Sequence, residues 1–253
     1  MGGHRVSALR LLLGPSGLVR HAYIYSIGAL RSCLRWALIF VLCLGIGFAV
    51  LLDVYARFNP PSTLMLSHKL SHEVVKQDWV SLNQISPALI GAVVLSEDGQ
   101  FCQHHGVDWT ALGEVMGDED GPTRGASTIA MQTAKNLFLW PSRSYVRKFI
   151  EIPLALAMDA VWSKARMLEI YLNIAEWGPG IFGAEAAARY HFGIPASALN
   201  ADQAALLATA LPSPMKRNPA HPRPGHRRMA ATIRAHLPEA STYLRCLLPN
   251  KEG

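Results

Sequence analysis

The sequence predicts a mainly α-helical protein in which one N-terminal transmembrane helix precedes a globular domain. An uncharged run, 36–52, follows five arginines. From Ala88 onward, apolar residues recur mostly at helical spacing, and signals for strands are weak. Half of the 253 residues are apolar and only 17% are charged, a composition that excludes a disordered chain.

The N-terminal segment predicts a membrane anchor over residues 34–56, behind a basic cytoplasmic arm, 1–33. At ~1.5 Å per residue the uncharged run nearly crosses a hydrocarbon core of ~30 Å, and Val54–Phe58 can extend it. Arginines stay in the cytoplasm, so the rest of the chain is expected outside. A cleaved signal peptide with its site at Val54–Ala56 and a buried core helix are the alternatives. We favour the anchor because the run exceeds a signal core of ~7–15 residues.

The net charge of +6 does not indicate a nucleic-acid partner. Residues 1–57 carry six arginines and one aspartate, whereas the remaining chain is almost neutral, with 18 basic and 17 acidic side chains. The basicity therefore belongs to the membrane-proximal arm, and no nucleic-acid binding is expected.

The segments after the anchor are predicted from local signals. Residues 57–84 read as a linker or lead-in because they open on two prolines and have little periodicity. An apolar helix begins at Pro87, and a Ser or Thr cap precedes the helix that follows residue 128. The domain is expected to cover residues 85–248, with a short tail at 249–253. Its helices are expected in segments 87–98, 107–118, 127–140, 145–162, 164–177, 183–193 and 200–212, and in a tail that is helical to about residue 248.

Two positions within these segments bear on the fold. Pro153 lies inside the segment 145–162, so a kink or a break is expected near Ile152. The polar, glycine-containing segment 117–127 is expected to be a loop.

Two acidic residues lie at the edges of apolar sequence. Glu97 follows "AVVL", and Glu151 stands between "FI" and "IPLAL". An apolar wall disfavours the charged carboxylate and raises its pKa toward the range useful in acid–base catalysis, and paired acids of this kind serve glycosyl chemistry. From these features alone, two surface acids with local ion pairs fit as well.

Four cations lie between or beside these acids in the sequence: Lys135, Arg143, Arg147 and Lys148. Arginine binds phosphate through two hydrogen bonds and lysine supplies a point charge, so the cluster suits a pyrophosphate. A solvated helix face is the alternative.

The remaining candidate motifs are weak. Cys102 with His104 and His105 lacks a second ligand pair at zinc spacing, so no metal site is assigned. Cys102 and Cys246 would face an oxidising compartment and could pair, but two free thiols are expected. The S-x-x-K sequence at 213–216 contains Pro214 and lacks the companion motifs of acyl-transferases, so it is rejected.

Five ordered motifs between about residues 85 and 220 resemble a known family. "EDGQFCQHHG" is similar to E-D-x-x-F-x-x-H-x-G, "GASTIAMQTAKN" to G-G-S-T-I-T-Q-Q-x-x-K-N, "RKFIE" to R-K-x-x-E and "KARMLEIYLN" to K-x-x-I-L-E-x-Y-L-N. "NIAEWGPGIFGAEAAARYHFG" and "ADQAALLATALPSP" resemble its closing segments. The family is glycosyltransferase family 51 of peptidoglycan synthesis, in its monofunctional form. Ala126, Ala130, Met131 and Met167 depart from the pattern; Met131 removes one amide and Gln132 keeps the other.

This resemblance implies a lysozyme-like, two-lobed domain with a cleft between the lobes. It implies that Glu97 is the general base, that Glu151 organises the donor side, and that Asp98, Phe101 and His104 support the loop carrying the base. It further implies a set of residues that binds substrate and pyrophosphate: Lys135, Arg143, Arg147, Lys148, Gln132, Ser127, Thr128 and Asn136. The sequence itself requires no cofactor, and Mg²⁺ or Mn²⁺ could accompany the pyrophosphate.

The implied reaction is the polymerisation of lipid II onto a lipid-linked glycan chain, with inversion and release of undecaprenyl pyrophosphate. The implied location is the inner membrane, with the N-terminus cytoplasmic, the domain periplasmic, and cell-wall synthesis proteins as possible partners. A lytic transglycosylase or lysozyme-like hydrolase of finished strands, and a non-catalytic wall-binding scaffold, are the alternatives. "LFLW", 137–140, could enter the membrane surface or could be buried core.

Overall fold

The computed structural model describes residues 15–72, 74–117, 125–141 and 144–247. Two compact units are distinguished, Met1–Leu51 and Leu52–Gly253. Helix α2 (Pro15–Arg57) runs through the first unit and into the second. Its part Gly28–Arg57 is long and apolar enough to cross a membrane, and side chains such as Phe40 and Leu44 are exposed. An uninterrupted apolar helix therefore stands where the sequence predicts the anchor.

The second unit begins with the last turn of α2. Leu52 is buried, and its carbonyl accepts a hydrogen bond from the Trp162 indole at 2.8 Å. The Arg166 guanidinium donates to the carbonyls of Tyr55 and Phe58, which lie near the end of the helix. Arg166 thus satisfies carbonyls at the end of the helix, where intrahelical partners are lacking, and Trp162 adds a second contact one turn earlier.

The lead-in to the domain contains more structure than its sequence indicates. Helix α3 (Thr63–Leu70) is capped by Ser62, and it is followed by strand β1 (Lys76–Gln77) and the 3₁₀ turn η1 (Leu82–Gln84).

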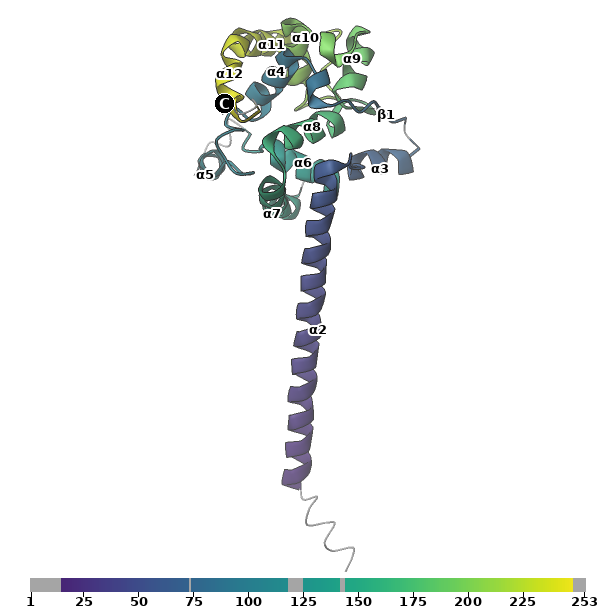
Figure 1. The fold of residues 1–253 in the computed structure, drawn as a ribbon, viewed down its shortest axis with the longest axis vertical. Helices are drawn as coiled ribbons and strands as arrows, with labels where there is room; N and C mark the ends of the chain where they lie inside the picture. The colour runs from purple at the N-terminus through teal and green to yellow at the C-terminus, as the bar shows by residue number, and fades with distance from the viewer. Residues whose placement is uncertain (1–14, 73, 118–124, 142–143, 248–253) are drawn as a thin grey trace, which may run out of the picture. The chain divides into compact units, whose positions relative to one another are not determined.

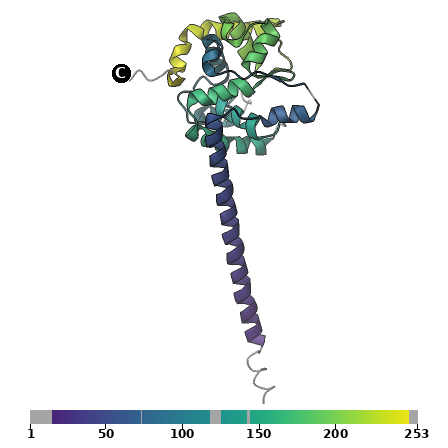
Figure 2. The same ribbon diagram turned by 45° about the vertical axis from the view of Figure 1, so that its right-hand side comes forward.

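One group of helices in the second unit surrounds α4 (Pro87–Glu97). Helices α10 (Ala201–Ala210), α11 (Pro224–His236) and α12 (Ala240–Tyr243) pack against it (Figures 1 and 2). The approach is close: a Cβ at Gly91 would lie 3.0 Å from that of Ala240. Because neighbours cover several of its faces, α4 carries apolar residues almost throughout its length.

A second group consists of α6 (Ile129–Phe138), α7 (Tyr145–Val161) and α8 (Lys164–Ile174). The expected cap of α6 is confirmed: the Thr128 hydroxyl accepts a hydrogen bond from the Met131 amide. Helix α7 is continuous through Pro153, so the alternative of a break is wrong. Pro153 and Phe149 lie on an exposed face, where water can satisfy the Phe149 carbonyl that loses its partner.

The remaining elements include a small sheet that was not predicted from the sequence. Strands β2 (Glu176–Gly178) and β3 (Ile181–Phe182) pair antiparallel, and β1 adds parallel to β3. Strands of two or three residues are too short to show an alternating pattern. Helix α5 (Trp109–Gly117) follows α4 in the sequence and lies at the left edge of the unit in Figure 1. Helix α9 (Ala184–Phe192) ends at the left-handed Gly193, as predicted.

Short 3₁₀ turns complete the chain: η2 (Ala196–Ala198), η3 (Leu237–Glu239) and η4 (Arg245–Leu247). The expected loop at 117–127 lies mostly outside the described residues.

Candidate active site

Glu97 stands at the C-terminal end of α4, where the apolar core meets the site. Ser86 caps the helix, Pro87 occupies its first turn, and Asp98 is its C-terminal cap residue. The residues before Glu97 include Val93 and Val94, which are wholly buried. The helix therefore delivers one carboxylate to the border of the hydrophobic core.

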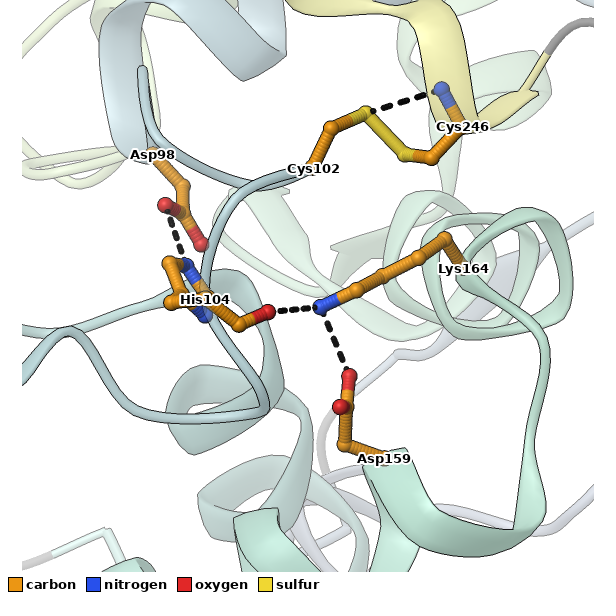
Figure 3. The surroundings of a disulfide bond; sticks show 6 residues. All are labelled: Asp98, Cys102, His104, Asp159, Lys164 and Cys246. Carbon is orange, nitrogen blue, oxygen red and sulfur yellow. Dashed lines mark hydrogen bonds and ion pairs between the residues drawn. A yellow bond between two sulfur atoms is a disulfide. The ribbon is translucent and has the colours of Figure 1, made fainter.

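Asp98 fixes the loop that follows Glu97. Its Oδ2 accepts a hydrogen bond from the Ile129 amide at 2.9 Å, and its Oδ1 lies 2.8 Å from His104 Nε2 (Figure 3). Ile129 begins α6, so the Asp98 carboxylate also compensates the positive end of that helix. The supporting roles predicted for Asp98 and His104 fit these contacts.

Phe101 and Gly106 within the same loop, and Lys164 of α8, fix its conformation. Phe101 is fully buried, and the Lys164 ammonium lies 4.9 Å from the centre of its ring. Lys164 also donates to the His104 carbonyl at 2.7 Å and pairs with Asp159 at 2.7 Å. Gly106 has a φ of +75°, and a Cβ there would lie 2.6 Å from the Ala155 carbonyl oxygen, so the motif requires glycine.

The Cys102–Cys246 disulfide corrects the expectation of two free thiols. The bond joins positions 144 residues apart and ties the loop after Glu97 to η4 (Figure 3). It also gives Cys102 a partner other than a metal ion. His104 pairs with Asp98, and the exposed His105 lies 3.4 Å from Asp159, so the three residues of the rejected metal motif have separate partners.

The Glu97 carboxylate has a neutral hydrogen-bond donor. Gln132 Nε2 donates to its Oε2 at 3.0 Å, and the Ser96 hydroxyl lies 3.4 Å from Oε1. Burial raises the pKa of Glu97 above its usual value, although these hydrogen bonds and the positive charges of Lys135 and Arg217 oppose that rise. Within the described part of the chain, no cation forms an ion pair with Glu97.

Glu151 is buried in α7 together with two cations. Arg147 NH1 lies 2.7 Å from its Oε1, and Lys148 Nζ lies 3.1 Å from its Oε2. Lys148 also donates to the Ser127 hydroxyl at 2.6 Å, which connects α7 with the segment before α6. The carboxylate thus orients both cations.

Lys135 lies within the electrostatic field of both acids. Burial lowers the pKa of its ammonium; Glu151 and Glu97 raise it, whereas Arg147 and Lys148 lower it. Among the side chains that the structure describes, none is hydrogen-bonded to or ion-paired with this ammonium. A half-buried cation that has no such partner among the described side chains, and that lies in the field of two acids, is available to an anionic ligand.

Two other predicted site residues, Thr128 and Asn136, take part in hydrogen bonds within the fold, and a third, Arg143, is not among the residues that the structure describes. Thr128 caps α6 and donates to the Gly106 carbonyl, and Asn136 is buried, its carbonyl accepting hydrogen bonds from Ser62 and Thr63. Contact of these two side chains with substrate stays a prediction.

Two residues that act on or near Glu97 were not predicted as site residues from the sequence. The buried Tyr171 of α8 donates its hydroxyl to Gln132 Oε1 at 3.1 Å. Arg217 follows α10, donates to the Thr209 carbonyl at 2.6 Å, and lowers the pKa of Glu97. The tyrosine stands in the quoted motif "KARMLEIYLN" and could have been singled out there, whereas no local signal marks Arg217.

Comparison with known proteins defines the class of the chain. The family model described as "Transglycosylase" matches residues 65–237. The chain therefore belongs to the transglycosylase family, which confirms the resemblance drawn from the motifs.

Individual relatives narrow this class. The "Biosynthetic peptidoglycan transglycosylase" of Agrobacterium fabrum is 52% identical over 203 residues, covering 79% of this chain and 90% of that protein. The protein of the same name from Mesorhizobium japonicum is 55% identical over 196 residues, 75% of this chain and 81% of its own. That from Rhizobium etli is 48% identical over 221 residues, covering 86% and 95%.

Proposed function

We propose that the chain polymerises lipid II into linear glycan strands, with Glu97 as the general base. As a member of its family, the chain is a peptidoglycan glycosyltransferase of cell-wall synthesis. The observation that carries the proposed role of Glu97 is its environment: burial raises its pKa, its hydrogen-bond partners are neutral, and the cationic group of Lys135 is close by.

In the proposed step, a Glu97 oxygen removes the proton from the 4-hydroxyl of the acceptor sugar. The resulting nucleophile attacks the anomeric carbon of the lipid-linked donor chain from the face opposite the leaving group. The bond from that carbon to the pyrophosphate oxygen breaks, so the configuration inverts and undecaprenyl pyrophosphate leaves with the bonding electrons. A base whose pKa is raised toward the working pH is suited to the first event.

The leaving pyrophosphate requires positive charge where its own charge develops. The Lys135 ammonium has no hydrogen-bond or ion-pair partner among the described side chains. The buried Glu151 holds Arg147 and Lys148, and the charges of both act on Lys135. Fixed cations of this kind stabilise a transition state without reorganising during the reaction. We include Arg143, Gln132 and Ser127 in the same binding set on the strength of the resemblance.

A divalent cation would enter with the substrate under this proposal. In the ranges that the structure describes, no three His, Cys, Asp or Glu side chains are grouped to hold a metal ion, and ion pairs engage both Glu151 oxygens. Among the residues that the structure describes, no resident metal site is thus formed, and under this proposal Mg²⁺ or Mn²⁺ would bind the pyrophosphate oxygens.

We propose that the chain is a single-pass protein of the inner membrane, with its N-terminus cytoplasmic and its catalytic unit periplasmic. The Cys102–Cys246 disulfide supports this orientation because such bonds persist in oxidising compartments. Exposed aromatic residues of the catalytic unit, Trp140, Tyr145 and Phe149, suit contact with a membrane surface that holds a lipid-linked substrate. Other cell-wall synthesis proteins are its expected partners.

Supplying the detergent-solubilised chain with labelled lipid II, and separately with finished glycan strands, tests the proposed reaction. Growth of polymer from lipid II alone is expected. Shortening of finished strands would instead indicate a lytic enzyme, and neither result in a folded protein would indicate a wall-binding scaffold. Protease added to spheroplasts tests the orientation: a protected catalytic unit, or a mature chain that begins at Arg57, would contradict the proposed anchor.

A further inference from the structure

A hydrogen-bonded chain of three side chains connects α8 with the proposed base. The Tyr171 hydroxyl lies 3.1 Å from Gln132 Oε1, and Gln132 Nε2 lies 3.0 Å from Glu97 Oε2. The three residues come from three helices, α8, α6 and α4, and Tyr171 is only 1% exposed. The hydroxyl therefore points into protein and away from solvent.

The chemistry of these groups allows one arrangement of the amide. An ionised carboxylate only accepts hydrogen bonds, so Gln132 must present its N–H groups to Glu97 and its carbonyl to Tyr171. A phenol can then complete the chain by donating. Burial raises the pKa of Tyr171 well above its usual value, and the negative charges of Glu97 and Asp98 add to the rise, so the donor proton is retained.

We infer that Tyr171 is a positioning residue: its hydroxyl fixes the orientation of the Gln132 amide and thereby directs an N–H toward Glu97. Without that hydroxyl, the amide can rotate, and its carbonyl oxygen can accept a hydrogen bond from the protonated carboxyl of Glu97. Glu97 would then lose a donor to its ionised form. The inference rests on the proposed role of Glu97 as the base.

The consequence concerns the proton on Glu97. A hydrogen bond to the ionised carboxylate lowers its pKa, so losing this bond raises that pKa further. The other groups that act on Glu97 would be unchanged: Ser96, Lys135 of α6, and Arg217 from the segment after α10. A base acts only when it is deprotonated. As the pH is lowered, activity should therefore begin to fall at a higher pH than in the wild type.

The test is the pH dependence of kcat/KM for polymerisation of lipid II by the full chain. We expect Tyr171→Phe to move the acid limb upward by about one pH unit, with a plateau at high pH close to that of the wild type. Thr133→Val is the matched control. This substitution removes a different buried hydroxyl, which belongs to α6 and donates to the Ile129 carbonyl. It should leave the acid limb in place.

A double substitution shows whether Tyr171 acts through Gln132. Gln132→Ala should raise the limb by itself, and adding Tyr171→Phe should produce no further shift. A limb that Tyr171→Phe leaves in place, an equal loss at every pH, or additive shifts would each overturn the inference.

Tyr171→4-aminophenylalanine restores a weaker donor, and its limb should fall between those of the wild type and Tyr171→Phe. If Tyr171→Phe does not fold, this variant carries the test, and a wild-type limb in it overturns the inference. Glu97→Gln separates the two proposals. An acid limb that persists in its residual activity contradicts the assignment of the base, whereas a limb lost there but unmoved in Tyr171→Phe contradicts only the role of Tyr171.

Discussion

Glu97 and Glu151 are both acids at the edge of apolar sequence, yet the structure surrounds them differently. Glu97 accepts hydrogen bonds from an amide and a hydroxyl, whereas Glu151 lies between the charged groups of Arg147 and Lys148. Burial without a paired cation favours proton exchange, and burial with two cations favours a fixed charge arrangement. The groups paired with each carboxylate, more than its burial, therefore distinguish the candidate base, Glu97, from Glu151, which orients the cations.

The largest expected effect comes from removing the candidate base. Glu97→Gln keeps the size of the side chain but cannot take a proton, so polymerisation of lipid II should fall by about 10²–10⁴-fold. Glu239→Gln, on an exposed acid, is the control and should not change the rate. Turnover with labelled lipid II is the measurement; a folded Glu97→Gln protein that works at the wild-type rate refutes the role of Glu97.

The same substitution should hardly lower stability. A carboxyl group whose pKa is raised by folding costs free energy in its ionised form, so this cost appears as pH rises from the ordinary pKa through the raised one. The neutral amide of Glu97→Gln avoids it. Thermal melts at pH 7 should therefore give an unchanged or slightly higher Tm.

Glu151→Gln should show the opposite pattern. The change leaves Arg147 and Lys148 without their counter-charge, and Arg147 is largely buried, so stability should fall by roughly 3 kcal/mol. Glu185→Gln is the control: it changes another buried acid that pairs with an arginine outside the site, the exposed Arg189. Chemical denaturation measures the stability of both variants, and turnover of lipid II measures their activity. Equal losses of stability, with a decrease in activity for Glu151→Gln alone, would support a role of Glu151 in the site. Unchanged stability of Glu151→Gln would contradict the contrast with Glu97.

Local sequence signals predicted the framework of this site, and longer-range contacts completed it. The start of α4 at Pro87 and the Thr128 cap of α6, which place Glu97 and Gln132 on their helices, depend on neighbouring residues and were predicted from sequence. The disulfide depends on the approach of positions 144 residues apart, which no spacing rule reveals. The Tyr171 contact likewise requires that α8 be known to lie against α6.

Removing the disulfide should affect the Glu97 side of the site more than the Glu151 side. Cys102→Ser opens a long cross-linked loop, and stability should fall by about 2–5 kcal/mol. Hydrogen exchange should rise in residues 98–106 and remain unchanged in 144–151. Cys43→Ser, on an unpaired cysteine, is the control. Equal exchange in both segments would show that the disulfide stabilises the domain as a whole.

The smallest expected effect belongs to Arg217, which acts on Glu97 through its field rather than through an ion pair. Its positive charge lowers the pKa of Glu97, so Arg217→Gln should raise the acid limb of kcat/KM, by roughly 0.2–0.5 of a pH unit because the arginine is partly solvated. Arg227→Gln is the matched control: that arginine also donates to a backbone carbonyl, of Pro222, but is absent from the groups that act on Glu97. The difference should shrink at high salt, which screens a charge reached partly through solvent. A downward shift would contradict the proposed effect of the Arg217 charge. An upward shift larger than that of Tyr171→Phe would mean that charge rather than the neutral amide governs the proton on Glu97, and the contrast with Glu151 would then disappear.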